Sequence, residues 1–441
     1  MSETLTVAAP FAAELDEAVA RPQPEGVRRL RAEAAERFRA LGFPTTREEE
    51  WRFTNVAPVA RTRFARPAAG DHRALAAELA VHHLPGACEI VFVDGRYAPE
   101  LSARELPAGL AVDSLAALLA REPEAVAAVL GRQATFANQP FLALSTALFE
   151  DGAVVRVAPR AVVETPIHLI FWSTGAAEPT ASFPRTLILA GEASQATVIE
   201  RFAGQAGATY LTCPVTELVA GPAAVVDHYK LQRESAAAYH LSGIAIETAR
   251  ASNVSTHSFS LGGAIVRHDI RAGLAGEGSV ATLNGLYLVV DRQLVDTHMR
   301  VDHRAPHCDS HELYKGVLDG RARAVFSGRI HVHPGAQKTD AKQTNRNLLL
   351  SDEAVANSQP QLEIYADDVK CTHGSTVGQL DDEAVFYLRS RGIGLEAARS
   401  LLTYAFAADL VERVKFEPLR RELQEFLFAW VPQGEVVRDA V

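Results

Sequence analysis

Between residues 152 and 379, apolar and polar positions alternate in many short runs, which Gly, Asn, Asp and Pro separate. Alternation with a period of two is typical of β-strands, and the separating residues are typical of turns. Helical periodicity is nearly absent from this region. The pattern therefore predicts a long succession of short strands.

These strand runs resemble one another, because each places a turn before an alternating segment. The turns recur at intervals of 30, 30, 25, 44 and 47 residues, aligned on Gly191, Gly221, Ala251, Gly276, Gly320 and Asp367. With the last two intervals taken as double units, single units of about 25 residues predict a β-solenoid, in which each unit buries its apolar face on its neighbours. A β-sandwich is the alternative, since it also has regular short strands.

The part of the chain before the strand runs has a mixed pattern. Residues 10 to about 60 are predicted to be helical, and Gly, Pro and an intervening Phe at 42–44 end the main run. Its apolar residues at helical spacing are Val27, Leu30, Ala34, Phe38 and Leu41. A strand-like run follows at 89–97, and short helical pieces follow at 115–130. We therefore expect a mainly helical N-terminal α/β region over residues 1–150.

A helical pattern returns at Asp381, which is a suitable N-cap. Arg389 and Arg391 would lie in the last turn of this helix, and Gly392 is placed to end it. Two further helices are predicted over 395–414 and 419–431. The chain thus divides into the N-terminal region, a β-solenoid core over 151–380 and a C-terminal helical module over 381–441, which we expect to dock on the last strand.

Composition and charge exclude several classes of protein. The chain has 441 residues, of which 48% are hydrophobic, so it can bury a large core. A net charge of −10 argues against a nucleic-acid-binding protein. No apolar run reaches the roughly 18 residues that a membrane-spanning helix needs. The N-terminus lacks the features of a signal peptide, so we expect a cytoplasmic protein with no membrane contact.

Several catalytic motifs are missing from the sequence. It contains no GxxxxGK[ST] phosphate loop, no GxGxxG opening a helix after a strand, and no GxSxG elbow. An autonomous ATPase, dehydrogenase or serine hydrolase is therefore poorly supported. A polysaccharide-cleaving solenoid carries no motif that a single sequence must reveal. That enzyme, and a purely structural β-helix interaction protein, stay open as alternatives.

Two histidine-rich segments are weak candidates for a metal site. The first carries His298, His303, His307, Cys308 and His311. Zinc sites usually take two close pairs of ligands across a loop, and this spacing does not match. We interpret the segment as a polar loop with surface histidines. His331 and His333 share one face of a strand, which can bind a metal ion but more commonly marks a half-exposed strand.

The most informative pair is Cys371 and His373. In a strand over 369–377, these two side chains share a face with two valines. A buried structural pair, a nucleophilic Cys/His dyad and a soft-metal or iron-sulfur ligand pair are all compatible with this arrangement. Two ligands cannot complete a metal site, so further ligands would come from a second chain or from small molecules.

The other cysteines give no alternative site. The four thiols are scattered without CxxC spacing, at Cys88, Cys213, Cys308 and Cys371. A disulfide framework is not expected from such a pattern, and the thiols should be reduced.

The region from about Arg300 to Val414 resembles the SufB/SufD family of iron-sulfur cluster assembly proteins. The resemblance rests on VDHRAP, ELYKGVLDGRARAVFSGRI, GAQKTDAKQTNRNLLLS and PQLEIYADDVKCTHGSTVGQLDDEAVFYLRSRGI. The EEEWRFTN segment and the KCTHGSTVG strand are similar to the SufD branch, whereas the scaffold branch carries a glutamate-bearing version of that strand. Residues 150–300 match more loosely, and 60–150 are the least distinctive part.

The resemblance implies a right-handed parallel β-helix flanked by helical regions. It also implies a non-catalytic subunit that pairs with a SufB-like paralogue and a SufC-like ABC-type ATPase, and that contributes to iron acquisition and nascent cluster formation at the paralogue interface. Nucleotide hydrolysis would then belong to the ATPase. We expect the ATPase to dock on the C-terminal module, because this module is amphipathic and compact and directly follows the strand with Cys371 and His373.

By family analogy, His373 ligates a nascent iron-sulfur cluster that is transient and shared with the partner chain. Cys371 is the neighbouring ligand or transfer candidate. The resemblance leaves open whether flavin binds the complex and whether the chain alone forms a homodimer.

Overall fold

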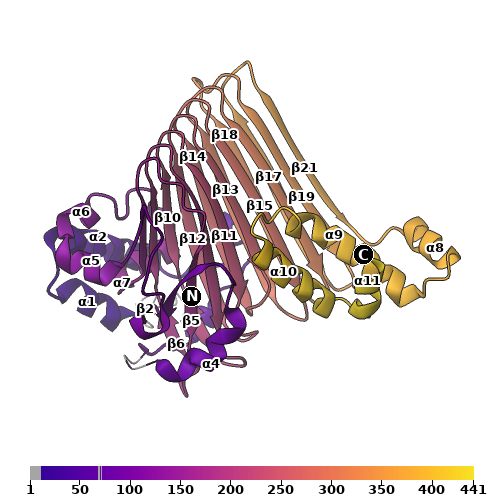
Figure 1. Cartoon of the computed structure of the whole chain (residues 1–441), viewed down its shortest axis with the longest axis horizontal. Helices are drawn as coiled ribbons and strands as arrows, with labels where there is room; N and C mark the ends of the chain where they lie inside the picture. Colours follow the sequence, from indigo (N-terminus) through magenta and orange to yellow (C-terminus); the bar gives the residue numbers. More distant parts are fainter. Residues whose placement is uncertain (1–10, 68–69, 71) are drawn as a thin grey trace, which may run out of the picture.

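The chain is mainly β and forms a parallel β-solenoid of about eight turns (Figure 1). The computed structural model describes residues 11–67, 70 and 72–441. The first ten residues, where the predicted N-terminal region begins, lie outside the described residues. Two long sheets face each other across a shared interior, and each turn contributes one strand to each sheet. Among the strands that the structure describes, pairing is parallel except between β1 and β2 and between β3 and β4.

Among the described residues, ten strands form sheet 1, in the spatial order β2 (Arg96–Tyr97), β1 (Cys88–Val93), β5 (Ile167–Ser173), β8 (Gln195–Gly204), β11 (Val225–Arg233), β13 (Asn253–Ser260), β15 (Val280–Val289), β17 (Asp309–Leu318), β19 (Asp340–Leu349) and β21 (Lys370–Gly378). Sheet 2 runs in the order β20 (Val355–Ile364), β18 (Arg323–Val332), β16 (Leu294–His303), β14 (Ile265–Leu274), β12 (Tyr239–Thr248), β10 (Val215–Ala220), β7 (Arg185–Ala190), β4 (Ala153–Val157) and β3 (Leu110–Ser114), with β6 (Thr180–Ser182) and β9 (Tyr210–Thr212) beside this path.

Most turns of the solenoid are several residues longer than the predicted unit. Val280 pairs with Asp309, and Asp309 pairs with Asp340, so the residue numbers of these partners mark the length of two successive turns. The two longest intervals between turn signals are not double units. The turn at Gly276 precedes β15 of sheet 1, whereas the turn at Gly320 precedes β18 of sheet 2. Such an interval spans one and a half turns of the solenoid. The alternation of apolar and polar residues cannot show this, because the strands of both sheets alternate with the same period of two.

Stacked apolar side chains fill the interior. Phe326, Ile330 and Val332 of β18 are buried there, while Arg329 and His331 between them are half-buried and point outward. The same alternation runs through neighbouring turns, so every turn covers the inner side chains of the turn before it.

The N-terminal region covers part of the outer face of sheet 2. Its helices are α1 (Ala12–Ala20), α2 (Glu25–Leu41), α3 (Ala57–Arg61), α4 (Ala76–Leu79), α5 (Leu115–Arg121), α6 (Pro123–Ala127) and α7 (Pro140–Leu148), with single 3-10 turns η1 (Glu49–Trp51), η2 (Arg73–Leu75), η3 (Ala80–His82) and η4 (Pro99–Leu101). Phe38, Trp51 and Phe141 pack there with Leu241 and Ile265 of the sheet.

The main helical run predicted at the start of the chain is confirmed as α2, which ends at Gly42, whose φ is 68°. The predicted range of 10 to about 60 was too wide, because residues 21–24 separate α1 from α2 and residues 42–48 form no helix. The run at 89–97 is not one strand. Asp94 and Gly95 have φ values of 50° and 80° and turn the chain back between β1 and β2, as Asp-Gly commonly does in a hairpin. The helical pieces at 115–130 are interrupted at Pro123, which lacks a backbone N–H.

The C-terminal helices are α8 (Asp382–Ser390), α9 (Leu395–Val411), α10 (Glu417–Trp430) and α11 (Gly434–Ala440). The three predicted helices are confirmed, and α11 was not predicted. The side chain of Asp381 accepts a hydrogen bond from the N–H of Glu383 at 3.0 Å, as an N-cap does, and Gly392 has a φ of 87°. Helix α8 projects from the rest of the molecule (Figure 1).

The module does not dock on the last strand, so that prediction was wrong. Helices α9 to α11 fold back across the outer face of sheet 1, where Leu410, Leu419 and Leu423 pack in one cluster with Tyr229 and Leu286. Strands β11, β13, β15 and β17 of sheet 1 carry outward apolar side chains and therefore offer a wide surface. Most side chains of β21 are exposed, and this strand offers no comparable apolar surface to the helices.

Candidate functional site

The solenoid has an open end. Strands β20 and β21 are the last strands of the two sheets, and no strand among the described residues pairs with their outer edges. Apolar side chains in this last turn remain exposed: 40% of Val355, 40% of Ile364 and 47% of Val377. Tyr365, which follows β20, is 60% exposed. Every earlier turn is covered by the next one, and this turn is not.

Cys371 and His373 lie on the inner face of this uncovered turn. Strand β21 contains both residues, so the two side chains point to the same side. Cys371 is half-buried and packs beside Ile330, Val332 and Ala341, which belong to the interior. His373 lies farther along the strand and is exposed. The last turn therefore presents a thiol and an imidazole where a further turn would otherwise stack.

The thiol of Cys371 is not activated in the isolated chain. Burial raises the pKa of Cys371, and the negative charge of Asp340 adds to the effect. The thiol is therefore protonated at neutral pH, and a metal ion or a base would have to displace its proton before it could act as a ligand.

A polar ladder leads from His373 into the interior. Glu312, Gln343 and His373 occupy the same register position on β17, β19 and β21. Gln343 is buried and donates a hydrogen bond from Nε2 to the carboxylate of Glu312. Burial raises the pKa of the Glu312 carboxyl to about 8, although the hydrogen bond from Gln343 acts in the opposite direction. A buried acidic proton therefore lies two strands behind the exposed imidazole.

A second buried network supports the rest of β19. The hydroxyl of Tyr287 donates to Asn347 Oδ1 at 2.6 Å and accepts from Asn345 Nδ2 at 3.0 Å, while Asn347 Nδ2 donates to Asn345 Oδ1 at 2.7 Å. Asn345 and Asn347 pair in register with Ser375 and Val377. The strand on which β21 rests is therefore held by side chains as well as by its backbone.

Glu312 and Gln343 were not among the predicted site residues, because the predicted repeat was too short to align them with His373. Gln343 precedes His373 by one turn of the solenoid, and Glu312 precedes it by two. A repeat of the observed length would have placed all three in one ladder.

The first histidine-rich segment is not a polar loop, and its side chains do not converge. Residues 298–303 lie in β16 and residues 309–311 in β17. His303 is fully buried, and its Nε2 lies 2.9 Å from the hydroxyl of Ser310. The interpretation as surface histidines is therefore wrong for His303, because strand alternation turns it inward together with Val301. His307 lies in an exposed turn with a φ of 58°.

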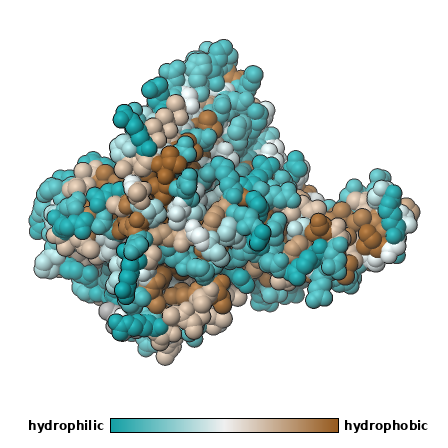
Figure 2. All heavy atoms as spheres, in the orientation of Figure 1, coloured by the Kyte–Doolittle hydropathy of each residue, from teal (hydrophilic) through white to brown (hydrophobic). Residues whose placement is uncertain are grey.

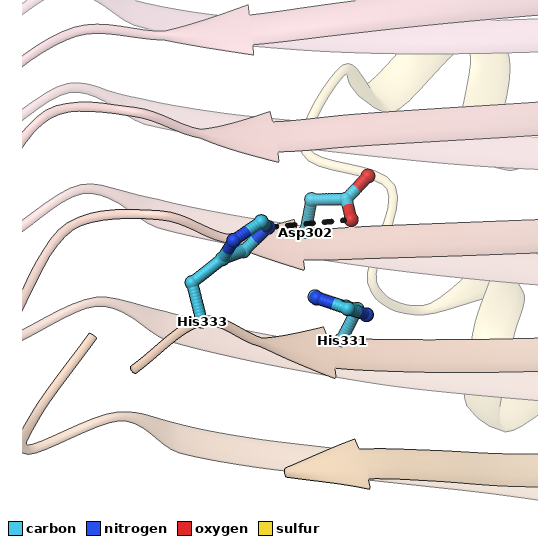
Figure 3. Close-up of side chains that lie close together, drawn as sticks. All are labelled: Asp302, His331 and His333. Carbon is cyan, nitrogen blue, oxygen red and sulfur yellow. Dashed lines mark ion pairs between the residues drawn. The ribbon is translucent and has the colours of Figure 1, made fainter. Parts of the chain in front are cut away.

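A different group brings metal-type ligands together within the described part of the chain. Asp302, His331 and His333 lie on the outer face of sheet 2, with their ligand atoms all within 4.8 Å of one another (Figure 3). The sequence had paired the two histidines, but it gave no reason to add Asp302, which belongs to the preceding turn.

Two family models match nearly the whole chain. The SufBD protein N-terminal region matches residues 11–169, and the model described as SUF system FeS cluster assembly, SufBD core domain, matches residues 171–406. The chain belongs to the SufBD family of iron-sulfur cluster assembly proteins. Family membership thus accounts for the solenoid without a polysaccharide-cleaving activity.

Individual relatives agree with the SufD branch. The chain is 34% identical to the iron-sulfur cluster assembly protein SufD of Escherichia coli, over 89% of this chain and 90% of that protein. It is also 34% identical to an iron-sulfur cluster assembly SufBD family protein of Synechocystis, over 89% and 88% of the two chains. SufD of Bacillus subtilis is 26% identical over 64% of each chain. These matches confirm the resemblance read from the KCTHGSTVG strand.

Within the described residues, no helix is both long enough and apolar enough to cross a membrane.

The buried acid Glu312 predicts a pH dependence of stability. Its folded-state pKa of about 8 lies above the value of about 4.3 expected in an unfolded chain, so its contribution is complete below pH 4.3 and is lost as pH rises through 8. We expect Glu312→Gln to reduce the fall in melting temperature between pH 6 and pH 9. Differential scanning calorimetry across this range measures the effect.

Glu353→Gln is the matched control, because Glu353 is exposed and pairs with Arg321 at the surface. It should follow the wild-type pH profile. Parallel profiles for the wild type and Glu312→Gln would contradict a buried, protonated Glu312.

Proposed function

We propose that this chain is a SufD-like subunit of an iron-sulfur cluster assembly complex, and that the open end of its solenoid pairs with a SufB-like paralogue. The observation that carries the proposal is the position of Cys371 and His373 on an uncovered inner face, surrounded by exposed apolar side chains. Exposed apolar patches and unpaired strand edges are typical of interaction surfaces. A paralogue with the same fold would offer a similar end, and so would a second copy of this chain.

The chemistry of the pair suits a nascent cluster. Thiolates are the usual ligands of iron-sulfur clusters, and imidazole also binds iron. Cys371 and His373 supply half of a ligand set, and the paralogue would supply the rest. Closure of the interface would enclose the cluster and exclude water from it. The chain itself would ligate the cluster transiently and contribute to iron acquisition.

We expect His373→Ala to weaken binding of the nascent cluster by about tenfold or more, as the loss of residues that support metal sites does, and thereby to lower the iron and sulfide content of the reconstituted complex. The complex would be reconstituted anaerobically with the paralogue and ATPase, and iron and sulfide would be counted per complex. His307→Ala and His311→Ala are the controls, because neither histidine lies at the open end. Equal losses in all three variants would contradict the assignment of His373.

The ATPase would dock on α8 and the start of α9. Helix α8 has no buried residue, and Phe386 and Tyr387 are 72% and 55% exposed. Leu395, the first residue of α9, is 43% exposed. Figure 2 shows apolar surface at this projecting end of the molecule. The rest of α9 to α11 packs on sheet 1. Deletion of the whole module would therefore expose the apolar face of sheet 1, and a loss of ATPase binding could not be assigned to the docking surface.

A double variant, Phe386→Asp with Tyr387→Asp, should weaken ATPase binding by about tenfold or more, since exposed aromatic residues often dominate interface energies. Isothermal calorimetry with the purified ATPase measures the loss, and co-purification checks that the paralogue still binds. Val81→Asp is the matched control, because Val81 is 76% exposed but lies in η3, in the N-terminal region. Unchanged ATPase affinity in the double variant would argue against docking on α8.

Nucleotide binding would open the paralogue interface. Asp381, which caps α8, lies ten residues after Cys371, so movement of a docked ATPase has a short path to β21. We expect Cys371 to react with a thiol reagent more slowly in the full complex than in the isolated chain, because the interface covers it, and faster again when ATP is added to the complex. Mass spectrometry of the labelled peptide measures the rates.

The wild-type chain suffices for this experiment, since Cys88, Cys213 and Cys308 are buried. A Cys371→Ser variant gives the background. Labelling at the same rate with and without ATP would exclude nucleotide-controlled access. Slow labelling of the isolated chain at high concentration would instead reveal self-association through the open end.

A further inference from the structure

The group formed by Asp302, His331 and His333 lies on the outside of the solenoid, away from the Cys371 and His373 pair. Asp302 is near the end of β16, His331 is near the end of β18, and His333 follows β18 directly. Figure 3 shows the three side chains on one side of the sheet, with the dashed line joining His333 to Asp302. His333 Nε2 lies 3.8 Å from Asp302 Oδ1, and the two imidazole rings are 4.4 Å apart between their centres.

His331 is already oriented as a metal ligand would be. Its Nδ1 lies 2.8 Å from Oε2 of Glu363 on the next strand, β20. A neutral imidazole that donates from Nδ1 keeps a lone pair on Nε2, and histidines that bind metals usually donate their other nitrogen to a carboxylate in this way. Asp302, His331 and Glu363 are in register across three neighbouring strands, so the backbone ladder fixes their relative positions.

We infer that Asp302, His331 and His333 form a binding site for a divalent first-row transition-metal ion. Two imidazoles and one carboxylate are the ligand set that Zn²⁺ and Fe²⁺ take in proteins, whereas Mg²⁺ and Ca²⁺ prefer sites made of oxygen ligands alone. Bonds of about 2.0 to 2.2 Å to a tetrahedral ion place the ligand atoms about 3.3 Å apart. The group is slightly wider than this, and rotation of the His333 side chain, which is 41% exposed, can close it.

Arg300 would compete with a metal ion for the carboxylate of Asp302. Its guanidinium donates to both oxygens of Asp302, from Nε at 3.0 Å to Oδ2 and from Nη2 at 2.9 Å to Oδ1. A metal ion that takes one carboxylate oxygen must weaken this pair. The site therefore predicts an unusual effect, namely that removal of the arginine charge strengthens cation binding. If the three side chains were only surface ion pairs without the geometry of metal ligands, their substitution would not change the affinity of the chain for Zn²⁺.

The test is a Zn²⁺ titration of the full-length chain, alone and under anaerobic conditions, against a chromophoric chelator. The chain would carry Cys371→Ser and His373→Ala, so that the open end does not contribute ligands and the outcome is independent of the proposed function. We expect one Zn²⁺ ion per chain. Asp302→Asn, His331→Ala and His333→Ala should each weaken its binding by about tenfold or more. His311→Ala, a histidine on the other sheet, should leave it unchanged.

Arg300→Gln should tighten Zn²⁺ binding severalfold, and weaker or unchanged binding in this variant would contradict the role of Asp302 as a ligand. Substitution of Co²⁺ gives a second readout, since its visible spectrum reports coordination by nitrogen and oxygen and should disappear in His331→Ala. Melting temperatures check that each variant is folded. Equal Zn²⁺ affinity in the parent chain and the three ligand variants would overturn the inference.

Discussion

Stacking of successive turns is the constraint on which the rest of this molecule depends, because a single turn cannot bury its own inner face. Phe326 and Ile330 of β18 are buried only because the turns on either side cover them. The same constraint leaves the last turn of the solenoid without a further turn to cover its inner face. The N-terminal helices and C-terminal helices lie over the outer faces of the sheets and leave the inner face of the last turn exposed, so the position of Cys371 and His373 is a consequence of where the stack stops.

Buried polar pairs inside the solenoid restrict how the turns can stack. Oε2 of Glu200 lies 2.9 Å from Nε2 of His228 and also accepts a hydrogen bond from Thr216 at 2.9 Å. Burial lowers the pKa of Lys230 to about 7, and the nearby carboxylates only partly oppose this effect. A shift of one strand by a single residue would leave such groups unpaired in the interior, at a cost of several kcal/mol each. These groups therefore help to fix the register of β8 against β11.

Features that depend on neighbouring residues could be predicted from the sequence. Strand alternation indicated the solenoid, Asp381 and Gly392 marked the ends of α8, and residues two apart on a strand placed Cys371 beside His373. Features that depend on register between turns could not. Asp302 meets His331 across one full turn, and alternation alone does not say which strands are adjacent. The docking of α9 on sheet 1 was missed for the same reason.

Strand β20 connects the two sites near the open end. Its outer face carries Glu363, which orients His331, while its free edge and the exposed Ile364 belong to the surface that would meet a paralogue. An unpaired terminal strand is held on one side only, so its side chains are less firmly positioned than those of an inner strand. A partner that pairs with β20 would hold Glu363 in place and thereby favour the His331 tautomer that binds metal. Occupation of the outer site would, by reciprocity, order the strand that the partner recognises.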